Sequence, residues 1–439
     1  MMLAGWARYP RAECRVIAPR SRSEVLETVT VQPSLIARGN GRAYGDAALN
    51  PDAALDLRRC DRFIAFDGTT GVLEAEAGAL LIDILNVFVP RGWFPPVTPG
   101  TKFVTLGGML AADVHGKNHH KAGTIGAHVE SFMLALADGR VLRCARDENA
   151  ALFAATLGGM GLTGVILSAR LTLQRIETAY IRQETLRAHD LDEIMALFDA
   201  SHDWTYTVAW IDCLARGPDL GRALLYRGEH ARCVELPPNK WAAPFAVTAR
   251  RTLRVPIDFP AAALNRRSIA IFNRLYYERA RPVTALVDYD RFFYPLDAVF
   301  DWNRMYGRRG FVQYQCVLPR AASRAGLTAL LERIVAVGAG SFLSVLKLLG
   351  PGRGMLSFPI EGYTLALDFR ADEANLALLT ELDVIVTAHG GRIYLAKDAR
   401  VAAADFRRGY DTLAEFATVR AAVDPGGKFA SLQSRRLGL

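Results

Sequence analysis

The stretch Arg38-Gly-Asn-Gly-Arg-Ala-Tyr-Gly-Asp46 decides the fold, and it directly follows a short apolar run at 35–37. Its three glycines lie within seven residues and predict a concave loop with exposed backbone N–H groups. Such a loop is a general binding site for a diphosphate. Arg38 and Arg42 are expected to add positive charge there. An ordinary glycine-rich turn without a ligand is the alternative, because the pattern alone is common.

Two further segments extend this pattern toward the middle of the first half. Gly100 and the run Thr-Leu-Gly-Gly at 105–108 precede His-Gly-Lys-Asn-His-His at 115–120. Three histidines within six residues suggest a metal site. However, no carboxylate or thiol stands beside them at the spacing of a metal ligand, so no metal is expected. Glycine-rich loops next to a helix start fit a long diphosphate ligand better.

The run Gly-Met-Gly-Leu-Thr-Gly at 159–164 matches the dinucleotide fingerprint GxGxxG. A Rossmann site needs a strand before the glycines and a helix after them. Here the sequence predicts a helix at 148–157 and a strand at 165–173, which is the reverse order. A Rossmann domain is therefore excluded. The glycines instead predict a tight helix-to-strand turn, or a close approach of the backbone to a flat ligand.

The composition of the 439-residue chain is that of a globular protein, with 51% hydrophobic and 22% charged residues. This length predicts two lobes. No segment reaches the roughly 20 uncharged apolar residues that cross a bilayer. Charges at Arg8, Arg11 and Glu13 do not fit a secretion signal. The six cysteines form no CxxC pair, so neither a zinc site nor a disulfide framework is expected. We therefore expect a cytoplasmic location.

The segment 240–282 carries nine basic residues against two acids, nearly the whole net charge of +8. Aromatic and aliphatic residues are interleaved with these charges. The pattern suits an anionic membrane surface or a lipid phosphate as well as nucleic acid, and a solvated helical face is the plain alternative. We expect peripheral attachment to the inner face of a membrane, with Arg250, Arg251 and Arg254 near the headgroups, and no nucleic-acid partner.

Local patterns elsewhere predict a mixed α and β protein. Asp138-Gly139 lies between two apolar runs and predicts a hairpin with a type I′ turn. Helical spacing and apolar alternation define the remaining elements. Helices are expected at 80–89, 106–113 and 191–201 and from 401 onward, and strands at 206–211, 310–318 and 363–369.

Taken together, the motifs resemble FAD-binding flavoproteins of the vanillyl-alcohol-oxidase type, and among them the 2′-oxidases of polyprenyl-phosphoryl ribose. The resemblance extends from 9 to 436. It rests on the segments 38–46, 115–120, 158–164, 294–297, 302–311, 347–351, 356–360 and 394–400. The runs at 115–120 and 302–311 are far more specific than the glycine loops, which the wider superfamily shares.

This resemblance implies a two-lobed α+β fold. An FAD-binding domain of the vanillyl-alcohol-oxidase (PCMH) type is expected over 1–178. A substrate-binding cap domain built on an antiparallel sheet follows over 179–392. The final segment, 393–439, is expected to return to the FAD domain.

The resemblance also implies where FAD binds. Its diphosphate and adenosine are expected on backbone loops, with further flavin contacts elsewhere. The expected cofactor-binding residues are Ala37, Arg38, Gly39, Asn40, Gly41, Arg42, Ala43, Tyr44, Gly45, Asp46, Ala47, Gly100, Thr105, Leu106, Gly107, Gly108, Ala112, Asp113, Val114, His115, Ile166 and Tyr394. Lactone and alditol oxidases of the superfamily bond FAD through a histidine in the first glycine loop. The matching residue here is Arg42, so FAD is expected to be noncovalent.

The activity implied is oxidation of the 2′-hydroxyl of a polyprenyl-phosphoryl-β-D-ribose to the 2′-keto sugar. Lys397 is the expected catalytic residue, which accepts a proton or holds a positive field at the reacting oxygen. Lys117, Gln313, Gln315 and Lys347 are expected to line the substrate, although the two glutamines are also compatible with a solvent-facing strand. Lys347 stands in an apolar run, where an unpaired ammonium is costly, and is expected to contact the phosphate.

Two positions depart from this family and two other functions remain open. Some members carry a cysteine and an asparagine where this chain has Ala366 and Thr364, which affects pocket shape rather than hydride transfer. An FAD-dependent oxidase of a soluble sugar, alditol or aldonolactone is the first alternative. A flavin- or lipid-binding protein without turnover is the second. For the leading function, a keto-reductase of the short-chain-dehydrogenase type is the expected partner, completing epimerisation to the arabinose used in cell-wall arabinan.

Overall fold

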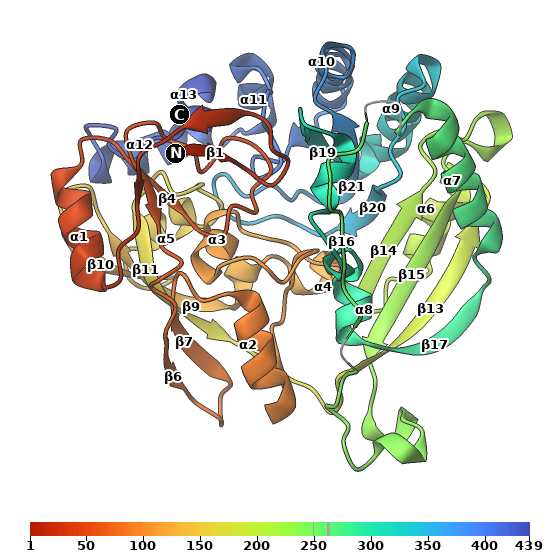
Figure 1. Cartoon of the computed structure of the whole chain (residues 1–439), viewed down its shortest axis with the longest axis horizontal. Helices are drawn as coiled ribbons and strands as arrows, with labels where there is room; N and C mark the ends of the chain where they lie inside the picture. Colours follow the sequence, from red (N-terminus) through yellow and green to blue (C-terminus); the bar gives the residue numbers. More distant parts are fainter. Residues whose placement is uncertain (249, 261–263) are drawn as a thin grey trace.

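Two groups of β-strands, one from each half of the chain, build the protein (Figure 1). The computed structural model describes residues 1–248, 250–260 and 264–439. Strands of the first half form small sheets, whereas strands of the second half join into one eight-stranded sheet. This mixture of helices and a large antiparallel sheet confirms the expected α+β class.

The first half contains a three-stranded parallel sheet and a five-stranded antiparallel sheet. The parallel sheet has the order β3 (Val16–Ile17), β5 (Ala54–Asp56), β4 (Ile36–Arg38). The five-stranded sheet has the order β10 (Val141–Ala145), β9 (Val129–Ala135), β11 (Val165–Thr172), β7 (Val72–Glu76), β6 (Phe63–Phe66). The helices of this half are α1 (Arg22–Val31), α2 (Leu81–Phe88), α3 (Leu106–Ala111), α4 (His119–Ala122) and α5 (Ala150–Thr156). Two short pairs, β1 (Met2–Ala4) with β2 (Arg11–Glu13) and β8 (Trp93–Phe94) with β12 (Gln174–Arg175), complete it.

The hairpin expected at Asp138-Gly139 is present between β9 and β10, but its turn is not of type I′. Only Gly139, with φ of +87°, has a positive φ, whereas a type I′ turn needs two such residues. The N–H of Gly139 donates to the oxygen of Leu136, and that of Leu136 donates to Arg140. This is a longer loop with one left-handed glycine.

The second glycine motif joins α5 to β11, the order that excluded a Rossmann site. Gly158, Gly161 and Gly164 all have positive φ. The N–H groups of Gly158 and Met160 donate to the oxygens of Leu110 and Ala111. The glycines therefore make a tight turn whose backbone is packed against the end of α3.

The second half forms an eight-stranded sheet in which all neighbouring strands are antiparallel. Its order is β17 (Val283–Asp288), β13 (Tyr180–Ala188), β15 (Ala223–His230), β14 (Tyr206–Ile211), β20 (Ser344–Leu349), β21 (Gly362–Arg370), β19 (Phe311–Pro319), β22 (Arg392–Ile393). A short parallel pair, β16 (Leu253–Arg254) with β18 (Val299–Phe300), also belongs to this half. Two helices, α7 (Arg266–Arg279) and α8 (Tyr289–Phe293), also belong to this half.

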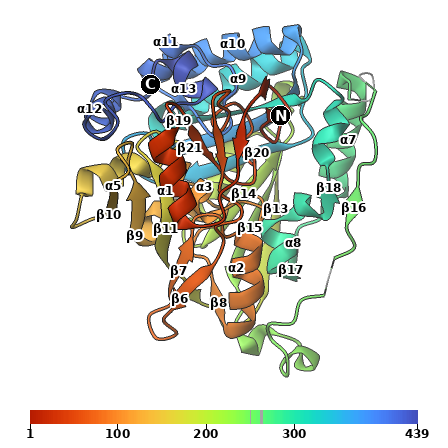
Figure 2. The same cartoon turned by 60° about the vertical axis from the view of Figure 1, so that its left-hand side comes forward.

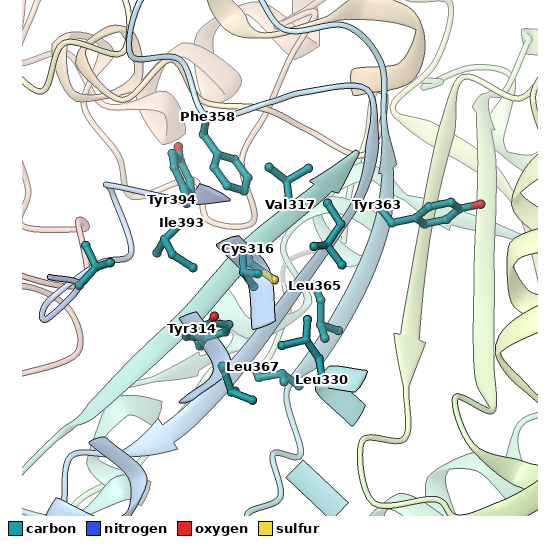
Figure 3. Close-up of a cluster of buried hydrophobic side chains, with 14 of the residues drawn as sticks. Tyr314, Cys316, Val317, Leu330, Phe358, Tyr363, Leu365, Leu367, Ile393 and Tyr394 are labelled. Carbon is teal, nitrogen blue, oxygen red and sulfur yellow. The ribbon is translucent and has the colours of Figure 1, made fainter. Parts of the chain in front are cut away.

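One face of this sheet is closed by α6 (Leu191–Asp199), α9 (Ser323–Val337) and α10 (Glu373–Ala388), with which it shares one core. Figure 3 shows Tyr314 and Cys316 of β19 with Leu365 and Leu367 of β21 packed in this core near Leu330 of α9. Because strand side chains alternate, the intervening residues of these strands point to the opposite face. That opposite face carries the site.

The C-terminal segment contains α11 (Ala403–Gly409), α12 (Leu413–Val423) and α13 (Leu432–Leu437). It reaches the first half, where the N–H of Leu35 donates to Lys428 and that of Ala430 donates to Leu35. The division into domains at 178 and 392 stays a prediction. Among the described residues, none of the helices has the length and apolar character needed to cross a bilayer.

Candidate active site

The first glycine loop, which follows β4, forms a cradle of backbone donors. Within the described part of the chain, none of the N–H groups of residues 39–43 donates to a protein acceptor. A Cβ atom on Gly39 would lie 2.1 Å from Oγ1 of Thr105, so glycine is required for the loop to approach the start of α3. Gly41 adopts φ of +63°. Successive free N–H groups in a concave loop are the donors that a diphosphate needs.

The two arginines of this loop differ in role. Arg38 donates from Nη1 to the oxygen of Ala48 at 3.2 Å and from Nη2 to the oxygen of Ala4 at 2.7 Å. Its guanidinium therefore holds the loop in place, and the expectation that it adds charge at the ligand stays a prediction. The guanidinium of Arg42 lies 4.0 Å from the ring of Trp6, and its Nε has no partner among the described residues.

The start of α3 closes the other side of the cradle. Oγ1 of Thr105 accepts from the N–H of Gly108 at 3.2 Å and caps the helix. Gly100 and Gly108 are exposed, so their backbone is accessible to a ligand. A pocket of about 430 Å³ lies beside this loop and is lined in part by Leu57, Ala77 and Ile166. It borders the cradle, because Leu57 donates to the oxygen of Arg38 and Gly107 donates to the oxygen of Ala77.

An aromatic cluster follows α3. Tyr394 stacks on Phe358 with ring centres 4.5 Å apart (Figure 3), and its centre is 5.3 Å from that of His115. The hydroxyl of Tyr394 donates to the oxygen of Ala112 at 3.0 Å. Asp113 is buried, and its carboxylate accepts from the N–H of Gly126 at 3.1 Å and from the Ser357 hydroxyl. The Asp113 side chain therefore holds this segment to its neighbours.

The substrate-side residues lie on the open face of the sheet. Gln313 pairs with Asp368, Gln315 with Ala366 and Lys347 with Thr364 across neighbouring strands, and paired residues share a face. Gln315 is only 4% exposed and donates to Oγ1 of Thr364 at 3.2 Å.

The two glutamines therefore do not face solvent. Gln313 donates to Oδ1 of Asp368 at 2.7 Å, and Nε2 of Gln315 lies 3.2 Å from Nε2 of His115. These contacts connect the sheet to the aromatic cluster. Ala366 and Thr364, where the family pattern differs, both belong to this wall of the site.

Three lysines surround the same space. Burial lowers the pKa of Lys117 to about 7 and that of Lys347 to about 8, and the charge of Lys347 lowers the Lys117 value further. Burial also lowers the pKa of Lys397 to about 7, an effect that the nearby Asp368 opposes and Lys347 strengthens. His115 has a pKa well below its usual range because it is buried and faces the same lysines. This cationic cluster favours an anionic ligand.

Lys397 joins the two lobes at the site. Its Nζ lies 3.5 Å from the ring centre of Tyr44. The N–H of Tyr44 donates to the oxygen of Ala396 at 2.9 Å, and a Cβ atom on Gly45 would lie 1.9 Å from the oxygen of Asp398. The end of the cradle loop and the segment that carries Lys397 are thus in direct contact. The first glycine loop, His115, Tyr394, Lys117, Lys347 and Lys397 therefore form one site.

The comparisons with known proteins agree with this geometry. Residues 15–145 match the FAD binding domain family, and residues 364–437 match the D-arabinono-1,4-lactone oxidase family. Over its full length the chain is 37% identical to decaprenylphosphoryl-beta-D-ribose oxidase of Mycolicibacterium smegmatis, of which it covers 97%. An uncharacterized protein of Streptomyces coelicolor is 39% identical over 81% of this chain and 99% of its own. L-gulonolactone oxidase of Bos taurus is 27% identical over 44% of each chain.

The chain belongs to the decaprenylphosphoryl-beta-D-ribose oxidase family. It is an FAD-dependent oxidoreductase. The residues present fit the cofactor, because the N–H groups of 39–43, which have no acceptor among the described residues, would supply donors for its diphosphate. His115 and Tyr394 lie between this cradle and the sheet.

The histidines of 115–120 have separate partners in this oxidase. His119 accepts from the N–H of Gly350 at Nδ1, His120 contacts the oxygen of Trp204, and His115 contacts Gln315. Among the described residues, no group of three histidine, cysteine or acidic side chains has the arrangement of a metal site.

Sequence reasoning missed Asp368 as a functional residue of this oxidase. Burial raises the pKa of its carboxyl to about 7, and it accepts from Gln313 and from the hydroxyl of Tyr306 at 3.4 Å. A signal was available: Asp368 is the one carboxyl of its strand and falls on the same face as Thr364 and Ala366. A lone carboxyl on the inward face of a strand needs partners, and here they lie in the site.

Proposed function

We propose that this enzyme oxidises the 2′-hydroxyl of a polyprenyl-phosphoryl-β-D-ribose to the 2′-keto sugar. The observation that supports this proposal is the cluster of Lys117, Lys347 and Lys397 around one space, with Asp368 as the single carboxylate whose charge acts on Lys397. Uncompensated buried cations are costly, and an anionic group on the substrate removes that cost. A sugar phosphate diester supplies such a group, whereas a neutral lactone does not.

In this mechanism Lys397 accepts the proton of the reacting hydroxyl. Its pKa of about 7 leaves a large neutral fraction at physiological pH, as a general base requires. The hydride acceptor for the same carbon would be supplied by FAD, which the backbone donors of 39–43 would hold. Gln315 and Tyr44 confine the sugar between the sheet and the cradle loop, so that the C–H bond is held in one orientation.

Lys347 and Lys117 are proposed to hold the phosphate. Lys347 has no hydrogen-bond partner among the described residues and is half-buried on the open face of β20. Lys117 donates to the oxygen of Phe292 and lies 4.2 Å from the ring of that residue, which fixes its ammonium at the rim. With the phosphate held by these two cations, we propose that the sugar carbon, rather than the phosphate, lies beside Lys397.

The test is anaerobic mixing of the FAD-loaded enzyme with polyprenyl-phosphoryl ribose or with free aldonolactones and alditols, followed by flavin absorbance. Bleaching by the phosphoryl ribose alone is expected. Bleaching only by the soluble substrates would favour an oxidase of soluble sugars, and no bleaching by either would favour a binding protein without turnover.

FAD is proposed to be noncovalent, because Arg42 occupies the position of the linking histidine in covalent relatives. Acid precipitation is expected to release all of the yellow colour into the supernatant. Flavin that remains on the denatured polypeptide would contradict this.

A partner and a location follow from the same proposal. Epimerisation needs reduction of the keto sugar, for which we propose a keto-reductase of the short-chain-dehydrogenase type. We also propose a cytoplasmic protein attached peripherally to the inner face of the membrane. Of the arginines expected near the headgroups, Arg250 is unsuitable: it contacts the oxygen of Tyr294 at 3.2 Å and Asp290 at 3.6 Å, and so holds its segment to α8. Arg251 and Arg254 are exposed.

A further inference from the structure

Helix α7 lies at the outer edge of the second half of the chain (Figures 1 and 2). One face of this helix exposes apolar residues to solvent. Ile271 is 61% exposed, Phe272 44%, Leu275 42% and Tyr276 40%. These four residues follow helical spacing and form one stripe. The opposite side of the helix is anchored, since Tyr277 packs with Trp210 and Leu224 of the sheet. The stripe is therefore a face of a fixed helix.

Positive charge surrounds this stripe. Arg266, Arg267, Arg274 and Arg279 lie on the helix and Arg281 follows it, all exposed. Glu278 is the one acid of the helix, and it accepts from Arg274 at 2.7 Å. An apolar stripe bordered by arginines is the composition of a helix that lies in the interface of an anionic bilayer.

The stripe is continuous with the site through aromatic side chains. The ring centres of Phe272 and Phe342 are 5.9 Å apart, and those of Phe342 and Tyr306 are 5.8 Å apart. Tyr306 donates to Asp368, which lies on the site-facing side of β21.

A pocket also connects the two regions. It has a volume of about 160 Å³, and its lining includes Ile269 of α7, Phe342, Tyr306 and Asp368. Trp210 donates to the oxygen of Phe342 at 3.2 Å and fixes that residue at the junction. The exposed stripe of α7 is thus joined to the wall of the site at Asp368 by packed aromatic side chains.

We propose that the exposed face of α7 inserts into an anionic bilayer and receives the prenyl tail of the substrate while the sugar enters the site. This inference rests on the proposed substrate. A prenyl chain stays in the bilayer because the transfer of each of its CH₂ groups out of apolar surroundings is unfavourable. The surface that delivers the sugar therefore has to be apolar, cationic and next to the site, and α7 has all three properties.

The experiment compares two variants of equal charge change. Ile271→Glu/Leu275→Glu places two carboxylates in the stripe. Val31→Glu/Val384→Glu places them at exposed apolar positions of α1 and α10, 67% and 59% exposed, away from α7. Both proteins, loaded with FAD, are mixed with vesicles of phosphatidylglycerol or phosphatidylcholine and sedimented. The stripe variant is expected to lose at least about tenfold in binding to phosphatidylglycerol vesicles, and the control variant is expected to match the wild type.

Flavin reduction separates this inference from the proposed function. Wild type and both variants are mixed with geranyl-phosphoryl ribose in solution and with decaprenyl-phosphoryl ribose in vesicles. The stripe variant is expected to reduce flavin normally with the short substrate and at least about tenfold more slowly with the vesicle-bound one. Equal rates of both variants on vesicles overturn the role of α7. A wild-type dimer that only the stripe variant dissociates also overturns it, because the stripe would then be an interface between two copies of the chain. No bleaching of the wild type by either substrate overturns the proposed function instead.

Discussion

The cradle loop at 39–43 and the open face of the cap sheet contribute to one site in different ways. The loop offers backbone N–H groups, and its side chains are absent or turned away, as Gly39 and Arg38 show. The sheet face offers side chains, with Lys347 and Asp368 at fixed register. Backbone donors bind the diphosphate of the cofactor, a group that every member of the superfamily shares. Side chains on a sheet can instead be substituted one at a time. The comparison predicts that cofactor binding and substrate chemistry can be lost separately.

The largest effect is expected from Lys397→Ala. Loss of a general base lowers the rate by about 10²–10⁴, and the cradle does not depend on this side chain. Flavin reduction in stopped flow should therefore fall by that factor, while FAD affinity, followed by fluorescence, stays within about twofold of the wild type. A variant that loses FAD as well would show that the two functions are not separable.

The next effect is expected from Gly39→Val, on FAD affinity instead of rate. A Cβ atom at this position would lie 2.1 Å from Oγ1 of Thr105, which pushes the loop away from α3. Overpacking of this kind costs about 1–3 kcal/mol, or about 5- to 150-fold in the dissociation constant of FAD. The rate of flavin reduction in the FAD-saturated variant should remain near that of the wild type.

Gly161→Ala is the matched control in the other glycine motif. Gly161 has φ of +80°, so alanine is strained there by about 1–2 kcal/mol. Its Cβ atom would meet only Cδ1 of Ile36 at 3.5 Å, an ordinary contact with the strand before the cradle loop, and it would not approach residues 39–43. The melting temperature is expected to fall with FAD affinity unchanged. Weaker FAD binding in this variant would contradict the separate roles of the two glycine motifs.

These two motifs also show what the sequence can and cannot predict. Both have glycines at short spacing, and the order of helix and strand correctly separated the turn at 158–164 from a Rossmann site. Whether N–H groups are free depends on distant partners such as Leu110 and Ala111, which no local pattern contains. Strand β14 was predicted with its observed bounds because a short run of aromatic and β-branched residues is a local signal.

Residues that depend on strand register were harder to predict. Asp368 meets Gln313 only because β19 and β21 pair in one register. The 14-residue helix α7 was not located, because arginines interrupt its apolar stripe. Arg250 was assigned to the membrane on charge alone, although its partners Asp290 and Tyr294 lie some 40 residues away in sequence.

A smaller effect is expected from pH on the rate of flavin reduction. It acts through the lysine and carboxyl side chains of the substrate site and not through the cradle loop. Lys397 accepts a proton only when neutral, and its pKa is about 7. Flavin reduction should therefore rise about tenfold per pH unit below pH 7 and level off above it. The charge of Asp368 raises the pKa of Lys397, so Asp368→Asn should move the rising limb to lower pH. A profile that stays in place in this variant would mean that another group supplies the base.

The smallest effect is expected from Ala366→Cys, which restores the residue found in some relatives. Ala366 is 9% exposed and lies between Gln315 and Val345 on the wall of the site, so a thiol adds one heavy atom to the space beside the sugar. Proton acceptance by Lys397 and hydride loss to FAD use no thiol. The maximal rate of flavin reduction should therefore stay within about threefold of the wild type, and the change should appear in the substrate concentration for half-maximal rate. A large fall in the maximal rate would mean that the wall at Ala366 positions the reacting carbon. The side chains of the sheet would then control the orientation of the sugar as well as the charge around it.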